Sequence, residues 1–198
     1  PFALFLSYDE PHNIYDFDPG AVADASGGAE TLPLPENWHR QRFDTVPKVQ
    51  QAFMTDDQGT RICGMRPDVW HAYRRFYREK VRAYDAQVGR VLAALEESGF
   101  ADRTVLVVTS DHGDMDAHHR LIFKGPFMYE QMVRIPLIIR VPEAFGGAGP
   151  ARVTGVDVVN TDFVPTLLDF CGSAPAVEPV DGASLHPLLT GTGPGPER

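Results

Sequence analysis

Two short runs rich in Val, Ile and Leu, at residues 104–109 and 135–141, constrain the fold more than any other feature of the sequence. Apolar residues at successive positions over so short a length are typical of strands that are covered on both faces, as in parallel sheets. Two further apolar runs, residues 2–8 and 153–159, predict additional strands.

Helical patterns alternate with these strands. Between residues 68 and 98 the apolar residues recur at steps of three and four, which predicts a long amphipathic helix. Pro67 suits the first turn of this helix, and Gly99 suits the position just past its end. A second helix is predicted at residues 162–170. The alternation indicates an α/β fold with a mostly parallel sheet flanked by helices.

Composition limits the class of protein. A chain of 198 residues suits one domain, and its 43% apolar and 23% charged residues are typical of soluble globular proteins. The net charge is −9 without a basic block, so no nucleic-acid partner is expected. No apolar run is long enough to predict a membrane-spanning helix. Both a cytoplasmic and a periplasmic location fit this composition.

The remaining segments carry less pattern. Residues 16–60 are rich in Gly, Pro and polar residues and are predicted to form a long irregular insertion. Residues 190–198 are rich in Gly and Pro and predict a flexible tail. The two cysteines exclude a disulfide-dense scaffold. We expect Cys63 to be structural and Cys171 to lie in the core.

Ionisable residues follow two of the predicted strands. Asp111 and His112 come directly after residues 104–109, and His12 follows residues 2–8. Ligands collect at the carboxyl ends of strands in parallel sheets, so both loops are expected at one edge. A carboxylate beside an imidazole suits a divalent cation such as Ca²⁺, Mg²⁺, Mn²⁺ or Zn²⁺. An exposed turn is the alternative interpretation of the Asp-His pair.

Three more residues of this loop carry chemistry. Lys124, flanked by Phe123 and Gly125, is a candidate point charge for an anionic substrate, although its residue type alone favours an ordinary surface lysine. His119 is a candidate substrate contact, general acid or supporting group. His118 is interpreted as its solvated neighbour.

The segment "TVLVVTSDHGDMDAHHRLIFKGPFMYEQMVRIPLIIRVP" resembles the later half of the catalytic domain of the sulfatase family, within the alkaline-phosphatase-like superfamily. The stretches "PFALFLSYDEPHN", "YDAQVGRVLAALEESGFADRT" and "VVNTDFVPTLLDFCG" fit the same family in the same order. The resemblance covers most of the chain except residues 16–60 and the tail. It implies that residues 1–198 form a single but incomplete sulfatase-like catalytic domain.

The resemblance also implies roles for individual residues. Asp111 and His112 correspond to two ligands of the family's divalent metal, for which Ca²⁺ is the first candidate. Lys124 corresponds to the lysine that binds the sulfate or phosphoryl oxygens, and His12 to the histidine near the leaving group. His119 falls on the histidine after the Asp-His-Gly turn.

The sequence departs from the family at two places. Asp116 and Arg120 stand where many members carry an apolar residue and a glycine, so substrate contacts are expected to differ there. The family's first-strand aspartate pair and its Cys/Ser-x-Pro-x-Arg nucleophile motif, the source of formylglycine, do not occur in the chain. Both would precede Pro1, so we expect the chain to be part of a longer protein.

These residues support three functional hypotheses. The first is the metal- and anion-binding half of a hydrolase of small-molecule sulfate esters, which is inactive without the rest of its site. The second is a phosphonate monoester or phosphodiester hydrolase of the same superfamily, because an Asp-His pair replaces the Asp-Asn of many sulfatases. The third is an inactive fragment or pseudoenzyme that serves in folding or assembly. Exposed sheet edges in such a chain predict self-association.

Overall fold

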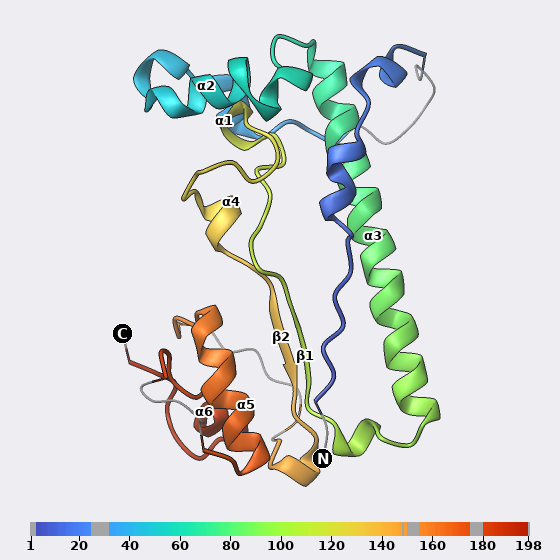
Figure 1. Cartoon of the computed structure of the whole chain (residues 1–198), viewed down its shortest axis with the longest axis vertical. Coiled ribbons are helices and arrows are strands. Elements are labelled where there is room, and N and C mark those ends of the chain that lie inside the picture. Colours follow the sequence, from blue (N-terminus) through green and yellow to red (C-terminus); the bar gives the residue numbers. More distant parts are fainter. Residues whose placement is uncertain (1–2, 25–31, 148, 150–154, 175–179, 198) are drawn as a thin grey trace. The chain divides into compact units, whose positions relative to one another are not determined.

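The computed structural model describes residues 3–24, 32–147, 149, 155–174 and 180–197, which belong to two compact units (Figure 1). The sheet unit comprises Pro1–Phe5, Leu92–Asp111 and Pro136–Arg198. The helical unit comprises Leu6–Val91 and His112–Ile135. That residues 1–198 form a single domain stays a prediction.

Two strands form the described sheet. β1 (Leu106–Thr109) and β2 (Leu137–Arg140) pair antiparallel, with Leu106 opposite Arg140 and Thr109 opposite Leu137. The predicted strands at 104–109 and 135–141 are thus present, but they do not run parallel. In this register β2 begins beside the end of β1, and the connecting segment contains only short helices. A parallel pair would need a crossover that returns along the sheet.

The other two predicted strands are not formed in the described residues. Residues 3–9 and 155–159 adopt no strand, while 1–2 and 153–154 lie outside the described residues. Leu4 and Phe5 are 69% and 82% exposed. A strand is defined by ladder hydrogen bonds to a neighbour, and the described ladder joins only β1 to β2.

Both predicted helices are confirmed. α3 (Pro67–Glu97) is continuous and ends before Gly99, which has a φ of +71°. α5 (Phe163–Cys171) ends at Gly172 with a φ of +62°, the left-handed conformation that terminates many helices. α6 (His186–Thr190) packs against α5 in the sheet unit. Cys171 is exposed at the end of α5, so its predicted place in the core is wrong; Cys63 is also exposed.

Residues 16–60, predicted to be irregular, contain α1 (Glu36–Arg40) and α2 (Lys48–Asp56). Each follows a proline, which disfavours helix at the residue before it but suits a helix start. α4 (Glu130–Val133) completes the described α-helices. The 3-10 helices are His12–Asp16, Pro19–Asp24, Phe43–Thr45, Gln58–Arg61, Ala101–Arg103, His118–Arg120, Glu143–Phe145 and Asn160–Asp162.

The core of the helical unit joins α1, the first turns of α3 and the segment after His112. Trp38 packs edge-on against Trp70 with 5.7 Å between ring centroids, and Tyr73 packs against Phe123 at 6.0 Å. Trp70, Tyr73 and Phe123 are at most 2% exposed. Burying each aromatic side chain contributes about 1.5–3 kcal/mol, so α3 anchors the segment that carries the predicted site. Every described helix is too short or too polar to span a bilayer.

The buried hydroxyl of Thr166 connects α5 with the segment before α6, and it gives a test of the fold. Thr166 Oγ1 donates to the carbonyl of Asp162 at 2.6 Å and accepts from the backbone N–H of Leu185 at 2.8 Å. Thr166→Val keeps the shape but leaves the Leu185 N–H buried without a partner. We expect a loss of about 1–3 kcal/mol in the free energy of unfolding, measured by urea titration. Thr166→Ser retains the hydroxyl and serves as the control; equal losses in both variants would contradict this account.

Candidate active site

The segment between His112 and Gly125, here called the histidine loop, has an unusual backbone. Left-handed φ values of +41° to +69° occur at non-glycine residues, namely Asp116, Ala117, His119, Arg120 and Phe123. This conformation costs roughly 1–2 kcal/mol per residue, so contacts with the rest of the helical unit must offset it. α3 and α1 supply those contacts.

Tyr73 of α3 is the first anchor of the loop. Its hydroxyl accepts from the backbone N–H of Phe123 at 3.1 Å and donates to Asp114 Oδ1 at 3.2 Å. The same carboxylate oxygen accepts from the backbone N–H of Asp116 at 2.8 Å. Burial raises the pKa of Asp114 to about 6 and also raises the pKa of Tyr73. The network holds both ends of the strained stretch to one helix.

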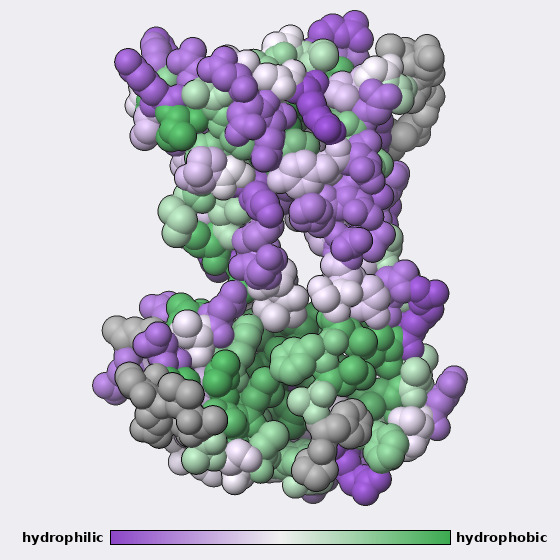
Figure 2. Space-filling view, in the orientation of Figure 1, coloured by the Kyte–Doolittle hydropathy of each residue, from purple (hydrophilic) through white to green (hydrophobic). Residues whose placement is uncertain are grey.

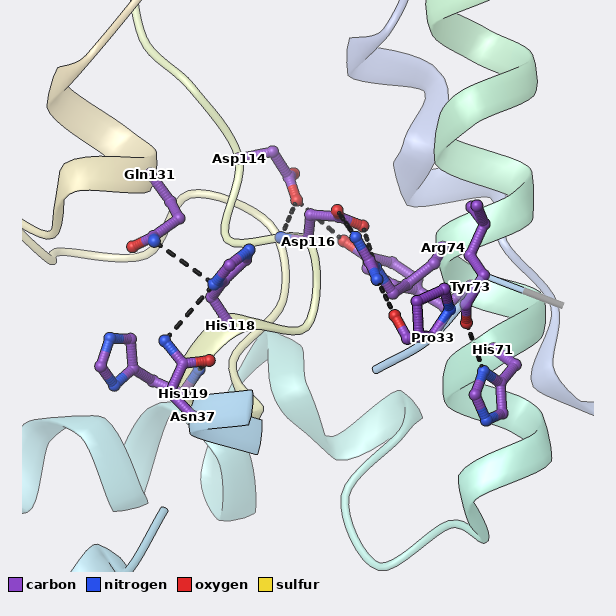
Figure 3. Close-up of polar contacts among 11 residues, drawn as sticks. Pro33, Asn37, His71, Tyr73, Arg74, Asp114, Asp116, His118, His119 and Gln131 are labelled. Atoms are coloured by element: carbon purple, nitrogen blue, oxygen red, sulfur yellow. Dashed lines mark hydrogen bonds and ion pairs between the residues drawn. The ribbon is translucent and has the colours of Figure 1, made fainter. Parts of the chain in front are cut away.

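Arg74, the next residue of α3, is the second anchor (Figure 3). Its guanidinium donates two hydrogen bonds to the Asp116 carboxylate, from Nη2 to Oδ2 at 2.7 Å and from Nε to Oδ1 at 3.1 Å. It also donates to the carbonyl of Pro33. The Arg74 and Asp116 side chains are only 17% and 21% exposed, so this pair is screened less than a surface pair.

His112 and Lys124 meet across the two ends of the loop. His112 Nδ1 lies 2.8 Å from the carbonyl of Gly113, so this nitrogen carries the proton and Nε2 carries the lone pair. Lys124 Nζ lies 3.4 Å from that Nε2. Gly113 permits this close return, because a Cβ there would lie 1.9 Å from the carbonyl oxygen of Gln131. The structure thus brings together two of the predicted site residues.

His112 has the tautomer that a metal ligand needs. Its Nδ1–H is fixed by a carbonyl, an arrangement common among metal-binding histidines, and its Nε2 faces Lys124 Nζ in this structure. Asp111, the preceding residue, belongs to the sheet unit and is exposed; Asn160 donates to its backbone carbonyl at 3.4 Å. Within the described residues no group of three or more His, Cys, Asp or Glu side chains could hold a metal. The donor types fit a divalent cation, and the metal site stays a prediction.

His12 lies exposed beside the histidine loop. Its ring is 5.0 Å from that of Tyr15, which stacks on Phe123 with centroids 4.1 Å apart. Phe123 directly precedes Lys124. Aromatic contacts therefore connect the predicted leaving-group histidine with the residue before the predicted anion-binding lysine.

His118 and His119 are both half-buried, so the prediction of a solvated His118 is wrong. His119 stacks on Tyr129 with centroids 4.1 Å apart. Amide side chains from α1 and its C-terminal neighbour, Asn37 and Gln41, contact these histidines. Burial lowers the pKa of both rings.

Comparison with known families shows which family the chain belongs to. The family model described as "Sulfatase" matches residues 1–173. This chain belongs to the sulfatase family. The predicted membership of the alkaline-phosphatase-like superfamily is confirmed. The exposed Cys63 is not in a Cys-x-Pro-x-Arg motif.

Relatives and solved structures agree with this assignment. An N-acetylglucosamine-6-O-sulfatase of Bacteroides thetaiotaomicron is 39% identical over 127 residues, which are 64% of this chain and 22% of that protein. The solved structure of a 2-O GAG sulfatase superimposes with a TM-score of 0.79 at 27% identity, covering 91% of this chain and 40% of the other. The predicted sulfatase-like α/β fold is thus confirmed, and this chain spans less than half the length of these relatives.

A phosphonate monoester hydrolase is also similar. The crystal structure of the enzyme from Agrobacterium radiobacter superimposes with a TM-score of 0.67 at 30% identity, covering 96% of this chain and 36% of the other. The likeness therefore extends beyond enzymes named for sulfate esters.

Sequence reasoning missed the residues that hold this sulfatase loop in place. Tyr73 fits the apolar pattern of residues 68–98, although its hydroxyl is the first anchor of the loop. Arg74 follows it without any pattern that pairs it with Asp116. Asn37 lies on α1 and Gln41 just past its end, and no sequence pattern in residues 16–60 indicates their contacts with the two histidines.

The Arg74–Asp116 pair gives a test of the loop. Arg74→Ala leaves the Asp116 carboxylate without its bidentate partner, so we expect the free energy of unfolding to fall by about 1–3 kcal/mol. Amide exchange in the histidine loop should also accelerate. Arg42→Ala is the control, because the Arg42–Asp44 pair is 72% and 63% exposed and should contribute little. Equal effects of the two variants would show that the buried pair has no special role.

Proposed function

We propose that the protein containing this chain hydrolyses sulfate esters with the help of a divalent cation, and that this chain provides the anion-binding part of the site. The observation that carries the proposal is the 3.4 Å approach of Lys124 Nζ to His112 Nε2. This contact places the positive charge of Lys124 beside the imidazole that is proposed as a metal donor. Family membership supports the reaction class.

Asp111 and His112 would hold the cation, with Ca²⁺ as first candidate and Mn²⁺, Mg²⁺ or Zn²⁺ as alternatives. A bound cation would polarise the sulfuryl oxygens of the ester. Lys124 would offset the charge that develops on the non-bridging oxygens. Its half-buried position between Phe123 and Gly125 limits the freedom of its side chain, which favours this role over that of a surface lysine.

The leaving group and the nucleophile complete the proposed reaction. His12 would donate a proton to the leaving alkoxide, and its contact with Tyr15 supports its orientation. His119 is the second histidine available to the substrate. The sequence holds no Cys/Ser-x-Pro-x-Arg motif, so we propose that a formylglycine nucleophile lies outside these residues.

The substrate is proposed to be a small sulfate ester. Two similar proteins are named for sugar sulfates, an N-acetylglucosamine-6-O-sulfatase and a 2-O GAG sulfatase. Sulfated sugars are therefore the first substrates to assay.

Hydrolysis of a phosphonate monoester or phosphodiester is the second candidate function, favoured by the 30% identity to a phosphonate monoester hydrolase. Parallel assays of a sulfate ester and a phosphonate monoester separate the two. Absence of both activities in the full-length protein would favour the third hypothesis, an inactive folding or assembly module.

Lys124→Ala in the full-length protein tests the proposed site. We expect turnover of the preferred ester to fall more than tenfold, or by more than about 1.4 kcal/mol in transition-state stabilisation. Lys48→Ala removes an exposed lysine at the start of α2 and is the matched control. An unchanged rate in Lys124→Ala would remove Lys124 from the site.

The isolated chain gives a second test. Without a nucleophile there is no covalent step, so residues 1–198 alone should hydrolyse p-nitrophenyl sulfate no faster than buffer. The rate is measured by absorbance with and without added Ca²⁺ or Mn²⁺. Metal-dependent turnover by this chain would refute the proposed division of the site.

We also propose that the isolated chain self-associates through the sheet unit. Figure 2 shows apolar residues gathered over this unit, where Phe5 and Ile138 are 82% and 62% exposed. Within the described residues each of the two strands pairs along one edge only, and unpaired edges favour pairing with another chain. Sedimentation velocity should show species larger than a monomer that increase with concentration. A single monomeric species at every concentration would contradict this prediction.

A further inference from the structure

Amide side chains surround the neighbouring rings of His118 and His119. Asn37 and Gln131 approach His118, and Gln41 approaches His119 (Figure 3 shows the first two contacts). An amide group offers a donor at one end and an acceptor at the other, so each contact can define which ring nitrogen carries the proton.

Asn37 fixes the tautomer of His118. The backbone N–H of His119 can only donate, and it lies 3.2 Å from Asn37 Oδ1. The amide orientation of Asn37 is therefore set, and its Nδ2 lies 3.3 Å from His118 Nδ1. Gln131 Nε2 lies at the same distance of 3.3 Å from that nitrogen. His118 Nδ1 thus accepts from the Asn37 amide with its single lone pair, and the proton is on Nε2.

Gln41 fixes the opposite tautomer of His119. Gln41 Nε2 donates to the carbonyl of Arg42 at 3.4 Å, which sets the orientation of the amide. Its Oε1 then lies 3.2 Å from His119 Nδ1. Because an amide oxygen can only accept, Nδ1 carries the proton and Nε2 carries the lone pair. No hydrogen bond to this Nε2 is present among the described residues.

We propose that Gln41 is a positioning residue that holds His119 as the Nδ1–H tautomer, so that Nε2 accepts a hydrogen bond from a hydroxyl group of the substrate. Asn37 holds His118 in the other tautomer and excludes it from this role. The tautomers follow from the amide contacts alone; the substrate contact rests on the proposed function.

The two rings respond differently to a proton. Protonation of His118 would place an N–H against the amide N–H of Asn37, whereas His119 can gain a proton at Nε2 and keep its bond to Gln41. Stacking on Tyr129, with ring planes 15° apart, fixes the direction of Nε2. Burial favours the neutral ring and lowers the pKa of His119, which preserves the acceptor at neutral pH.

Gln41 is the polar partner of the His119 ring among the described residues. Beside Gln41, Arg40 and Arg42 are paired with Glu36 and Asp44. The other ionisable side chains of these elements are His39 on α1, His112, Asp114, Asp116, His118, Arg120 and Lys124 on the loop, and Tyr129 and Glu130 at α4. Asp116 is paired with Arg74. Arg120 lies over the Trp38 ring at 4.9 Å.

Nitrogen NMR of the full-length protein with ¹⁵N-labelled histidine tests the tautomers directly. At pH 7.5, one of the pair should be protonated on Nδ1 and the other on Nε2, with assignments from His118→Asn and His119→Asn. Gln41→Leu should remove the Nδ1–H preference of His119, whereas Gln51→Glu on the exposed side of α2 should leave it intact. A wild-type His119 protonated on Nε2 would overturn the inference.

Gln41→Glu tests the substrate contact. A carboxylate 3–4 Å from Nδ1 should raise the pKa of His119 by about 1 unit or more. KM rises as the pH falls through the pKa of His119, because the protonated Nε2 cannot accept a hydrogen bond. In Gln41→Glu this rise should begin at a correspondingly higher pH, while kcat changes less. Gln51→Glu adds the same charge elsewhere and should not move the profile. An unmoved KM profile in Gln41→Glu would overturn the substrate contact. Loss of all ester hydrolysis by wild type would instead refute the proposed function and leave the NMR result unaffected.

Discussion

Two consecutive residues of α3, Tyr73 and Arg74, hold the histidine loop in its strained conformation. The Tyr73 hydroxyl bridges the backbone of Phe123 and the carboxylate of Asp114, and Arg74 grips Asp116. Burial of Tyr73 in the aromatic core makes this bridge rigid, since moving it would expose a fully buried ring. The left-handed residues of the loop are stable only because α3 holds both sides of them.

The chemistry of the site follows from this restraint. Fixing Phe123 also fixes the following Lys124, whose amine reaches the imidazole at the start of the loop. The turn at Gly113 completes the approach, because Gln131 leaves no room for a side chain there. The Lys124 ammonium group and the His112 imidazole are thereby held close together. This arrangement suits the proposed site for an anionic ester and a metal. Asn37 and Gln41, on α1 and just past its end, are proposed to hold His118 and His119 in opposite tautomers.

The sequence predicted the parts of this structure that depend on local patterns. The steps of three and four apolar residues located α3 and α5, and the Val-rich runs located β1 and β2. The direction of the strands could not be predicted, because it depends on the path of the connection from Thr109 to Leu137. Within the site, His112 and Lys124 were identified by resemblance to a family. Asn37 and Gln41 were not, because contacts across about 80 residues leave no periodic pattern.

A double-mutant cycle on His112 and Lys124 is the most direct measurement of the central claim, that these two residues act together on one anionic ester. It compares kcat/KM for the full-length protein, His112→Ala, Lys124→Ala and the double variant with the preferred ester. If both act on the same transition state, the loss in the double variant should be much smaller than the product of the two single losses. Strictly multiplicative losses would show that the two residues act independently and would contradict the account.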